Sequence, residues 1–125
     1  MSGEKPGKQY DLEERTLAFA QAVRAFVRQL PRTLSNIEDV KQLVRASGSV
    51  GANYIEANEA LSKKDFVMRI KISRKEAKES RFFLRLVFTD ADAGLETSRA
   101  VLIQEATELM NIFGTIVRKS EPPSK

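Results

Sequence analysis

The feature that most constrains the fold of this 125-residue chain is the spacing of three and four positions between its apolar residues. The pattern is clearest in residues 11–30, and Pro31 follows directly. Steps of three and four put side chains on one face of an α-helix, and proline ends a helix because it lacks an amide hydrogen. The segment therefore predicts an amphipathic helix. Its predicted buried face consists of Leu12, Thr16, Phe19, Val23, Phe26 and Leu30.

Three further helices are predicted at residues 36–60, 63–88 and 96–119. Ser35 with Glu38, and Ser62 with Asp65, have the spacing of a capping box, which marks the start of a helix. Residues 89–94 read as the turn between the last two segments. The predicted face of the second segment carries Ile37, Val40, Val44, Tyr54 and Ile55.

Four helices of similar length with short connections predict an all-α protein, an antiparallel up-down four-helix bundle. The bundle is expected over residues 11–119, between a flexible N-terminal segment (residues 1–10) and a disordered tail (residues 120–125). No run of about 20 apolar residues predicts a membrane span, and the first ten residues lack the apolar core of a secretory signal. We therefore expect a cytoplasmic protein with no membrane partner.

The absence of three residue types argues against catalysis. The chain has no Cys, no His and no Trp. Without Cys there is no thiolate nucleophile or disulfide, and without His the common zinc sites and Ser-His or Cys-His catalysis are excluded. Paired carboxylates remain, at Glu56 with Glu59 and at Glu76 with Glu79. They leave a carboxylate–metal enzyme using Mg²⁺ or Ca²⁺ as the least favoured reading, and we expect no enzyme, no metal and no cofactor.

A glycine-rich patch interrupts the second segment at residues 46–52. Each glycine inside a helix costs about 1 kcal/mol relative to alanine, so Gly48 and Gly51 need a reason. One reading is a phosphate-cradling loop, although no strand precedes it and no Gly-Lys-Ser/Thr follows. The favoured reading is close packing between helices. The small residues expected to face the patch are Ser73, Ala77 and Ser80.

Positive charge is concentrated on the third segment. Between Lys63 and Arg85 nine basic residues accompany three acidic ones, a net charge of +6, so the rest of the +4 chain sums to −2. On a helical wheel eight of the nine lie within about 120°. Such a face attracts phosphate groups, although a solvated face with no ligand is the common alternative. The eight residues are Lys63, Lys64, Lys71, Arg74, Lys75, Lys78, Arg81 and Arg85, called the basic face below.

The fourth segment carries more apolar surface than a bundle core requires. Its apolar residues cover about 200° of the wheel, whereas contact with a core needs about 100°. The surplus predicts a subunit interface that includes Ile103, Met110 and Val117. The alternative is a helix buried deeply in the single chain.

Several motifs resemble a known family. The stretches are Ser49-Val-Gly-Ala-Asn53-Tyr-Ile-Glu56-Ala57, Ser62-Lys-Lys-Asp-Phe66, Lys75-Glu76-Ala-Lys-Glu79-Ser80 and Phe83-Leu84-Arg85-Leu86. Over residues 11–118 the chain resembles the four-helix bundle protein family, also called the 23S rRNA-intervening-sequence protein family. Many members have Ala-Glu-Gly where this chain has Ile55-Glu56-Ala57, so it looks like a variant subgroup.

The resemblance implies an up-down bundle that assembles as a homopentamer and has no catalytic residues. The chain is more distantly similar to the accessory variability protein of retroelements, a basic pentamer that binds nucleic acid and a reverse transcriptase. Four positions match the family motifs, and we interpret them as a polar network between the second and third segments. They are Asn53, Glu56, Glu76 and Glu79.

These observations lead to one favoured function and two alternatives. We expect a non-enzymatic homo-oligomeric bundle that binds RNA or DNA through the basic face, with a nucleic-acid enzyme as a candidate partner. The first alternative is a protein–protein scaffold or adaptor with no nucleic-acid role. The second is the carboxylate–metal enzyme.

Overall fold

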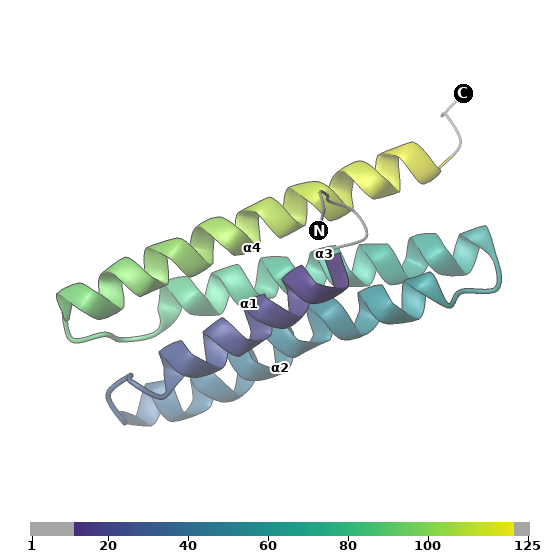
Figure 1. Ribbon diagram of the computed structural model, residues 1–125. Helices are drawn as coiled ribbons and strands as arrows, with labels where there is room; N and C mark the ends of the chain where they lie inside the picture. Colours follow the sequence, from purple (N-terminus) through teal and green to yellow (C-terminus); the bar gives the residue numbers. More distant parts are fainter. Residues whose placement is uncertain (1–11, 122–125) are drawn as a thin grey trace, which may run out of the picture.

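The computed structural model describes residues 12–121 and shows four α-helices that run alternately up and down (Figure 1). They are α1 (Leu12–Val27), α2 (Leu34–Asn58), α3 (Lys63–Leu86) and α4 (Ala93–Ser120). No strand occurs within this part of the chain. The predicted all-α four-helix fold is therefore confirmed. The predicted flexible segment, residues 1–10, and residues 122–125 of the predicted tail lie outside the described residues.

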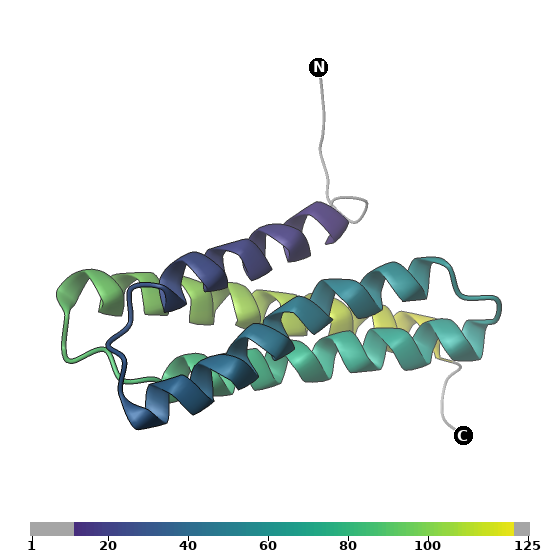
Figure 2. The ribbon, with the colours of Figure 1, turned by 90° about the horizontal axis from the view of Figure 1, so that it is seen from below.

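The four helices form a square arrangement. Each helix packs against two neighbours, so α1 and α3 lie on one diagonal and α2 and α4 on the other. Figure 2 shows α1, the shortest helix, inclined to the other three. Across the α2–α4 diagonal, the rings of Tyr54 and Phe113 meet with centroids 5.8 Å apart. These two rings therefore fill part of the central core between the four helices.

Side-chain caps mark the starts of α2, α3 and α4, and two of the predicted starts are wrong. The hydroxyl of Thr33, not Ser35, accepts the amide hydrogen of Asn36, at 3.1 Å, so α2 begins at Leu34. Similarly, Asp92 accepts the amide hydrogen of Leu95 at 2.8 Å, so α4 begins at Ala93 and includes Gly94. The predicted Ser62 cap of α3 is confirmed, because its hydroxyl accepts the amide hydrogen of Asp65. At its other end α4 includes Ser120, which was placed in the tail.

The core confirms the predicted face of the first segment and corrects that of the second. All six residues predicted to be buried in the first segment are buried. On α2, however, Ile37, Val40 and Val44 are only half-buried and Ile55 is exposed. The buried face is displaced because it contains polar and very small side chains that an apolar pattern cannot register. It consists of Asn36, Leu43, Ala46, Ser47, Val50, Tyr54 and Ala57.

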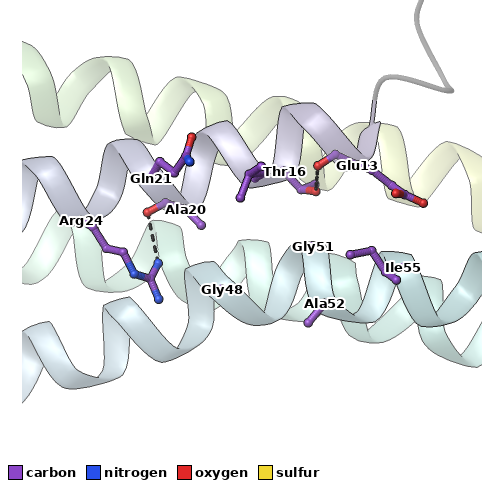
Figure 3. A pocket seen from close by; sticks show the side chains of 10 residues that line it. Glu13, Thr16, Ala20, Gln21, Arg24, Gly48, Gly51, Ala52 and Ile55 are labelled. Atoms are coloured by element: carbon purple, nitrogen blue, oxygen red, sulfur yellow. Dashed lines mark hydrogen bonds between the residues drawn. The ribbon is translucent and has the colours of Figure 1, made fainter.

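The glycine-rich patch is helical and lies where α1 and α3 approach α2. Residues 46–52 belong to α2 without interruption, so the phosphate-cradling loop is excluded. Towards α1, a side-chain carbon added at Gly51 would stand 2.7 Å from the Thr16 hydroxyl oxygen (Figure 3). Towards α3, the buried Ser73 hydroxyl donates to the Val50 carbonyl at 2.9 Å. The predicted close packing is present, although Gly51 itself serves α1 rather than α3.

One end of the bundle is joined by a buried amide. The Nδ2 group of Asn36 donates to the carbonyls of Pro31 and Phe88, both at 2.8 Å, and its Oδ1 atom accepts the Phe88 amide hydrogen at 2.9 Å. Asn36 is 2% exposed. Because buried backbone groups need partners, this side chain ties the α1–α2 connection to the α3–α4 connection.

An ion-pair cluster connects α1 to α4. The Arg15 guanidinium donates to Glu105 at 2.7 Å and to Glu108 at 2.8 Å. The Glu105 hydrogen bond is the main reason that the pKa of Arg15 is raised. Hydrogen bonds from Gln104 and then Arg15 lower the pKa of Glu108. These two ion pairs link α1, the inclined helix, to α4.

Replacing the two glycines of α2 by alanine should have opposite effects on stability. In Gly51→Ala the new carbon would meet the Thr16 hydroxyl at 2.7 Å, and such overpacking costs about 1–3 kcal/mol. In the control Gly48→Ala it would meet only the end of the Arg24 side chain, at 3.4 Å, and alanine favours the helix by up to about 1 kcal/mol. Urea unfolding measures both free energies. Equal effects of the two substitutions would contradict the close approach of α1 to α2.

Candidate nucleic-acid interface

The basic face is on the surface of α3. Seven of its eight side chains are exposed, and Arg81 is half-buried. They share one side of the helix, and the neighbouring side, which includes Ile70, Ser73, Ala77 and Leu84, packs into the core. The helical spacing that fills the core therefore also collects the positive charges in one row.

Within residues 12–121, five of the eight cations make neither an ion pair nor a hydrogen bond. Lys71 lies 2.8 Å from Glu121, and Lys75 is 4.0 Å from Glu76. Arg81 donates to the Thr107 hydroxyl at 3.3 Å. Within residues 12–121, no carboxylate lies within ion-pair distance of the other five. These unpaired residues are Lys63, Lys64, Arg74, Lys78 and Arg85.

Part of the basic face borders a cleft between α3 and α4. The cleft has a volume of about 290 Å³. Arg118 of α4 stands opposite Arg74 and Lys78 and adds a third cation. Sequence reasoning missed Arg118 because it lies outside the α3 pattern. The residues lining this α3–α4 cleft are Arg74, Lys78, Met110, Asn111, Gly114, Thr115 and Arg118.

Gly114 allows two guanidinium groups to approach each other across α4. A side-chain carbon added at this buried glycine would lie 3.4 Å from Arg118 Nη1 and 3.6 Å from Arg74 Nη1. Those two nitrogens are therefore no more than about 7 Å apart, the sum of the two distances. Two like charges at that separation repel each other by about 0.6 kcal/mol at the dielectric constant of water. An anion between them would remove this repulsion.

A second hollow lies between α1 and α2 and has a different character. Figure 3 shows the residues that line it, among them the small residues Ala20 of α1 and Gly48, Gly51 and Ala52 of α2. Its volume is about 360 Å³, and Leu17 and Ile55 on its rim are half-exposed. Only Arg24 contributes a cation, and its guanidinium donates to the Ala20 carbonyl at 3.2 Å. This groove is therefore not a candidate for phosphate binding.

The predicted interface residues of α4 are less exposed than expected. Val117 is 6% exposed and belongs to the core, so it is not available to a second subunit. Ile103 and Met110 are half-buried and pack against the core. The apolar arc is wide because α4 contacts both α1 and α3. By length and composition α4 could also span a membrane, which is weak evidence because the core helix of a bundle has the same composition.

The two carboxylate pairs differ in their surroundings. Glu56 and Glu59 are exposed, whereas Glu76 and Glu79 both contact Arg45. In the described part of the chain, no three acidic, His or Cys side chains are grouped closely enough to hold a metal ion.

The comparisons with known proteins identify the family. The sequence matches the family described as 23S rRNA-intervening sequence protein over residues 8–114. The chain belongs to this family. It is similar to a solved structure from Bacteroides thetaiotaomicron, described as a protein with unknown function from the S23 ribosomal protein family. The two share 25% identity with a TM-score of 0.74, over 85% of this chain and 97% of that one. Comparison with curated proteins found no match.

The family-motif residues form two separate contacts between α2 and α3 rather than one network. Asn53 accepts a hydrogen bond from Arg69 at 3.0 Å and donates to the Ser49 carbonyl at 3.0 Å. Nearer the other end, Arg45 lies 2.8 Å from Glu79 and 3.3 Å from Glu76. Glu56 is exposed. The two arginines that organise these contacts were absent from the predicted set.

Glu76 is the only buried residue among the four family-motif residues. It is 6% exposed, and its Oε1 atom makes no hydrogen bond, because the 3.3 Å approach of Arg45 meets the distance of an ion pair without the geometry of a hydrogen bond. The interaction with Glu76 is the main reason that the pKa of Arg45 is raised. Removal of Arg45 would leave a buried carboxylate with Lys75, 4.0 Å away, as its remaining cation within residues 12–121.

Arg45→Met should destabilise this family member by about 1–3 kcal/mol, because a buried carboxylate that loses its partner retains the cost of desolvation. The control is Lys41→Met, which removes an exposed cation 3.6 Å from Glu38 and should change stability by less than about 0.5 kcal/mol. The double variant Arg45→Met/Glu76→Leu should recover most of the loss. Urea unfolding distinguishes these outcomes, and equal stability of the two single variants would contradict the role of Arg45.

Proposed function

We propose that this family member is a non-enzymatic nucleic-acid-binding protein that contacts phosphate groups through the basic face. The supporting observation is that five exposed cations on one helix have no carboxylate partner within the described residues. Cations already engaged in ion pairs would have to lose those partners before contacting phosphate. Unpaired cations release counterions from the nucleic acid at no such cost.

The proposed contact is electrostatic and follows the backbone rather than reading bases. One exposed aromatic ring, Phe82, lies beside the basic residues, and it packs edge-on against Phe83 at 5.1 Å. A single ring does not make a platform for stacked bases. We therefore infer that binding depends on the density of phosphate groups in the nucleic acid and not on its base sequence.

Charge reversal of the basic face should abolish binding. Arg74→Glu/Lys75→Glu/Lys78→Glu is expected to lose affinity for structured RNA and for duplex DNA at 50 mM salt. The control Arg28→Glu/Arg32→Glu/Lys41→Glu reverses three exposed cations elsewhere and should retain binding. For the unmodified protein, log K should fall with log salt with a slope of about −3 to −5, as five phosphate contacts require. Absence of binding at low salt, or equal loss in the control, would overturn the proposal.

We also propose that the chain assembles as a homo-oligomer, a pentamer by the family resemblance. Half-buried Ile103 and Met110 contribute apolar area to α4, and Val101, on the side of α4 that borders α1, is 63% exposed. A protein–protein scaffold with no nucleic-acid role remains the second candidate. It is favoured by a set of exposed apolar side chains on α3, namely Met68, Phe82 and Leu86.

Sedimentation equilibrium measures the assembly directly. A pentamer of 14.1 kDa chains has a mass of about 70 kDa. We expect this mass at micromolar protein concentration and 0.5 M salt, because burial of apolar area is not weakened by screening of charges. A mass of one chain under these conditions would rule out stable self-association while leaving the nucleic-acid proposal to its own test.

A further inference from the structure

The α3–α4 cleft has features that a general basic surface lacks. Arg74, Lys78 and Arg118, from two different helices, line this one cleft, whereas the other cations of the basic face all belong to α3. Arg74 and Arg118 both reach the space that a side chain at position 114 would fill. The cleft is therefore a cradle with positive groups on both walls.

The donors in the cleft are directed and largely unused. Arg118 Nη2 donates to the Thr115 hydroxyl at 3.1 Å, which holds the guanidinium across the backbone of Gly114. A guanidinium has five N–H donors, so four remain for a ligand. Within residues 12–121, Arg74 and Lys78 make no ion pair. Three cations without a carboxylate are suited to an oxyanion that accepts several hydrogen bonds at once.

The size of the cleft limits what can enter. Its volume of about 290 Å³ is just below the roughly 300–1,000 Å³ found for small-molecule pockets. The walls carry cations and the polar side chains of Asn111 and Thr115, with Met110 as the main apolar contact. A phosphate group fits this composition better than a base or a whole cofactor does.

The charge of the cleft distinguishes between kinds of phosphate. An internal phosphodiester carries one negative charge, which a single cation balances. A phosphate monoester carries about −1.5 to −2 at neutral pH and has three terminal oxygens. The three cations that line the cleft suit the higher charge of the monoester. The other cations along α3 suit the single charge of each phosphodiester that would follow it.

We propose that the α3–α4 cleft binds a phosphate monoester, the terminal phosphate of a nucleic-acid strand. Arg74, Lys78 and Arg118 bind the phosphate oxygens, and Gly114 provides the space. The proposal rests on the proposed function for its ligand, because free phosphate has the same chemistry. It makes the protein a reader of strand ends, with the remaining basic face holding the adjoining backbone.

The test compares two oligonucleotides of one sequence, with a 5′-phosphate or a 5′-hydroxyl, by fluorescence anisotropy at constant ionic strength. The 5′-phosphate strand should bind about tenfold more tightly, and inorganic phosphate should compete away that preference. Lys78→Gln/Arg118→Gln should reduce the ratio of the two affinities to about one. The matched control Lys63→Gln/Lys64→Gln removes the same charge from the basic face outside the cleft, and it should weaken both strands while keeping the ratio.

Each result decides between the two proposals. Equal binding of both strands overturns the monoester site and leaves the nucleic-acid function intact. Binding of inorganic phosphate that Lys78→Gln/Arg118→Gln abolishes, without binding of either strand, supports the site and overturns the nucleic-acid function. Loss of the preference in the Lys63→Gln/Lys64→Gln control would also overturn the assignment to the cleft. Absence of binding by phosphate and by both strands overturns both proposals.

Discussion

The fold depends on how closely α2 is approached from two sides. Towards α1, Gly51 leaves no side chain between the α2 backbone and Thr16. Towards α3, Ser73 donates a buried hydrogen bond to the Val50 carbonyl of α2. A hydrogen bond to one particular carbonyl sets the register of two helices, which apolar contacts alone leave adjustable. With Ser73 turned to α2, the lysine and arginine side of α3 faces solvent.

The same register explains the other polar contacts between α2 and α3. Asn36 meets Phe88, Arg45 meets Glu79 and Asn53 meets Arg69, in the order expected for two antiparallel helices. Each contact crosses between the helices at a different height. Polar pairs of this kind add specificity to a bundle whose apolar stripes could pack in several ways. The register of α2 and α3 therefore determines both the polar contacts between them and the exposure of the basic face.

The sequence was sufficient for the fold class and for the face of the first helix, because apolar periodicity reports a purely apolar stripe. It was misleading on α2, where Asn36, Ser47 and Ala46 occupy core positions and the pattern selected their apolar neighbours. The basic face was predictable because its residues all belong to one helix and recur with the periodicity of that helix. Arg118, Gly114 and Arg45 were not, because their roles depend on which helices lie side by side.

The buried amide of Asn36 has a consequence for how the bundle loosens. It joins the two connections at one end, so that neither can separate without exposing backbone groups of the other. At the opposite end, the backbone hydrogen bonds of residues 59–62 in the described chain are local, and Leu61 is fully exposed. We therefore expect local opening to begin at the α2–α3 connection and to proceed towards Asn36. The first turn of α3, with Lys63 and Lys64, adjoins that connection, so we expect its cations to sample more positions than those of the α3–α4 cleft.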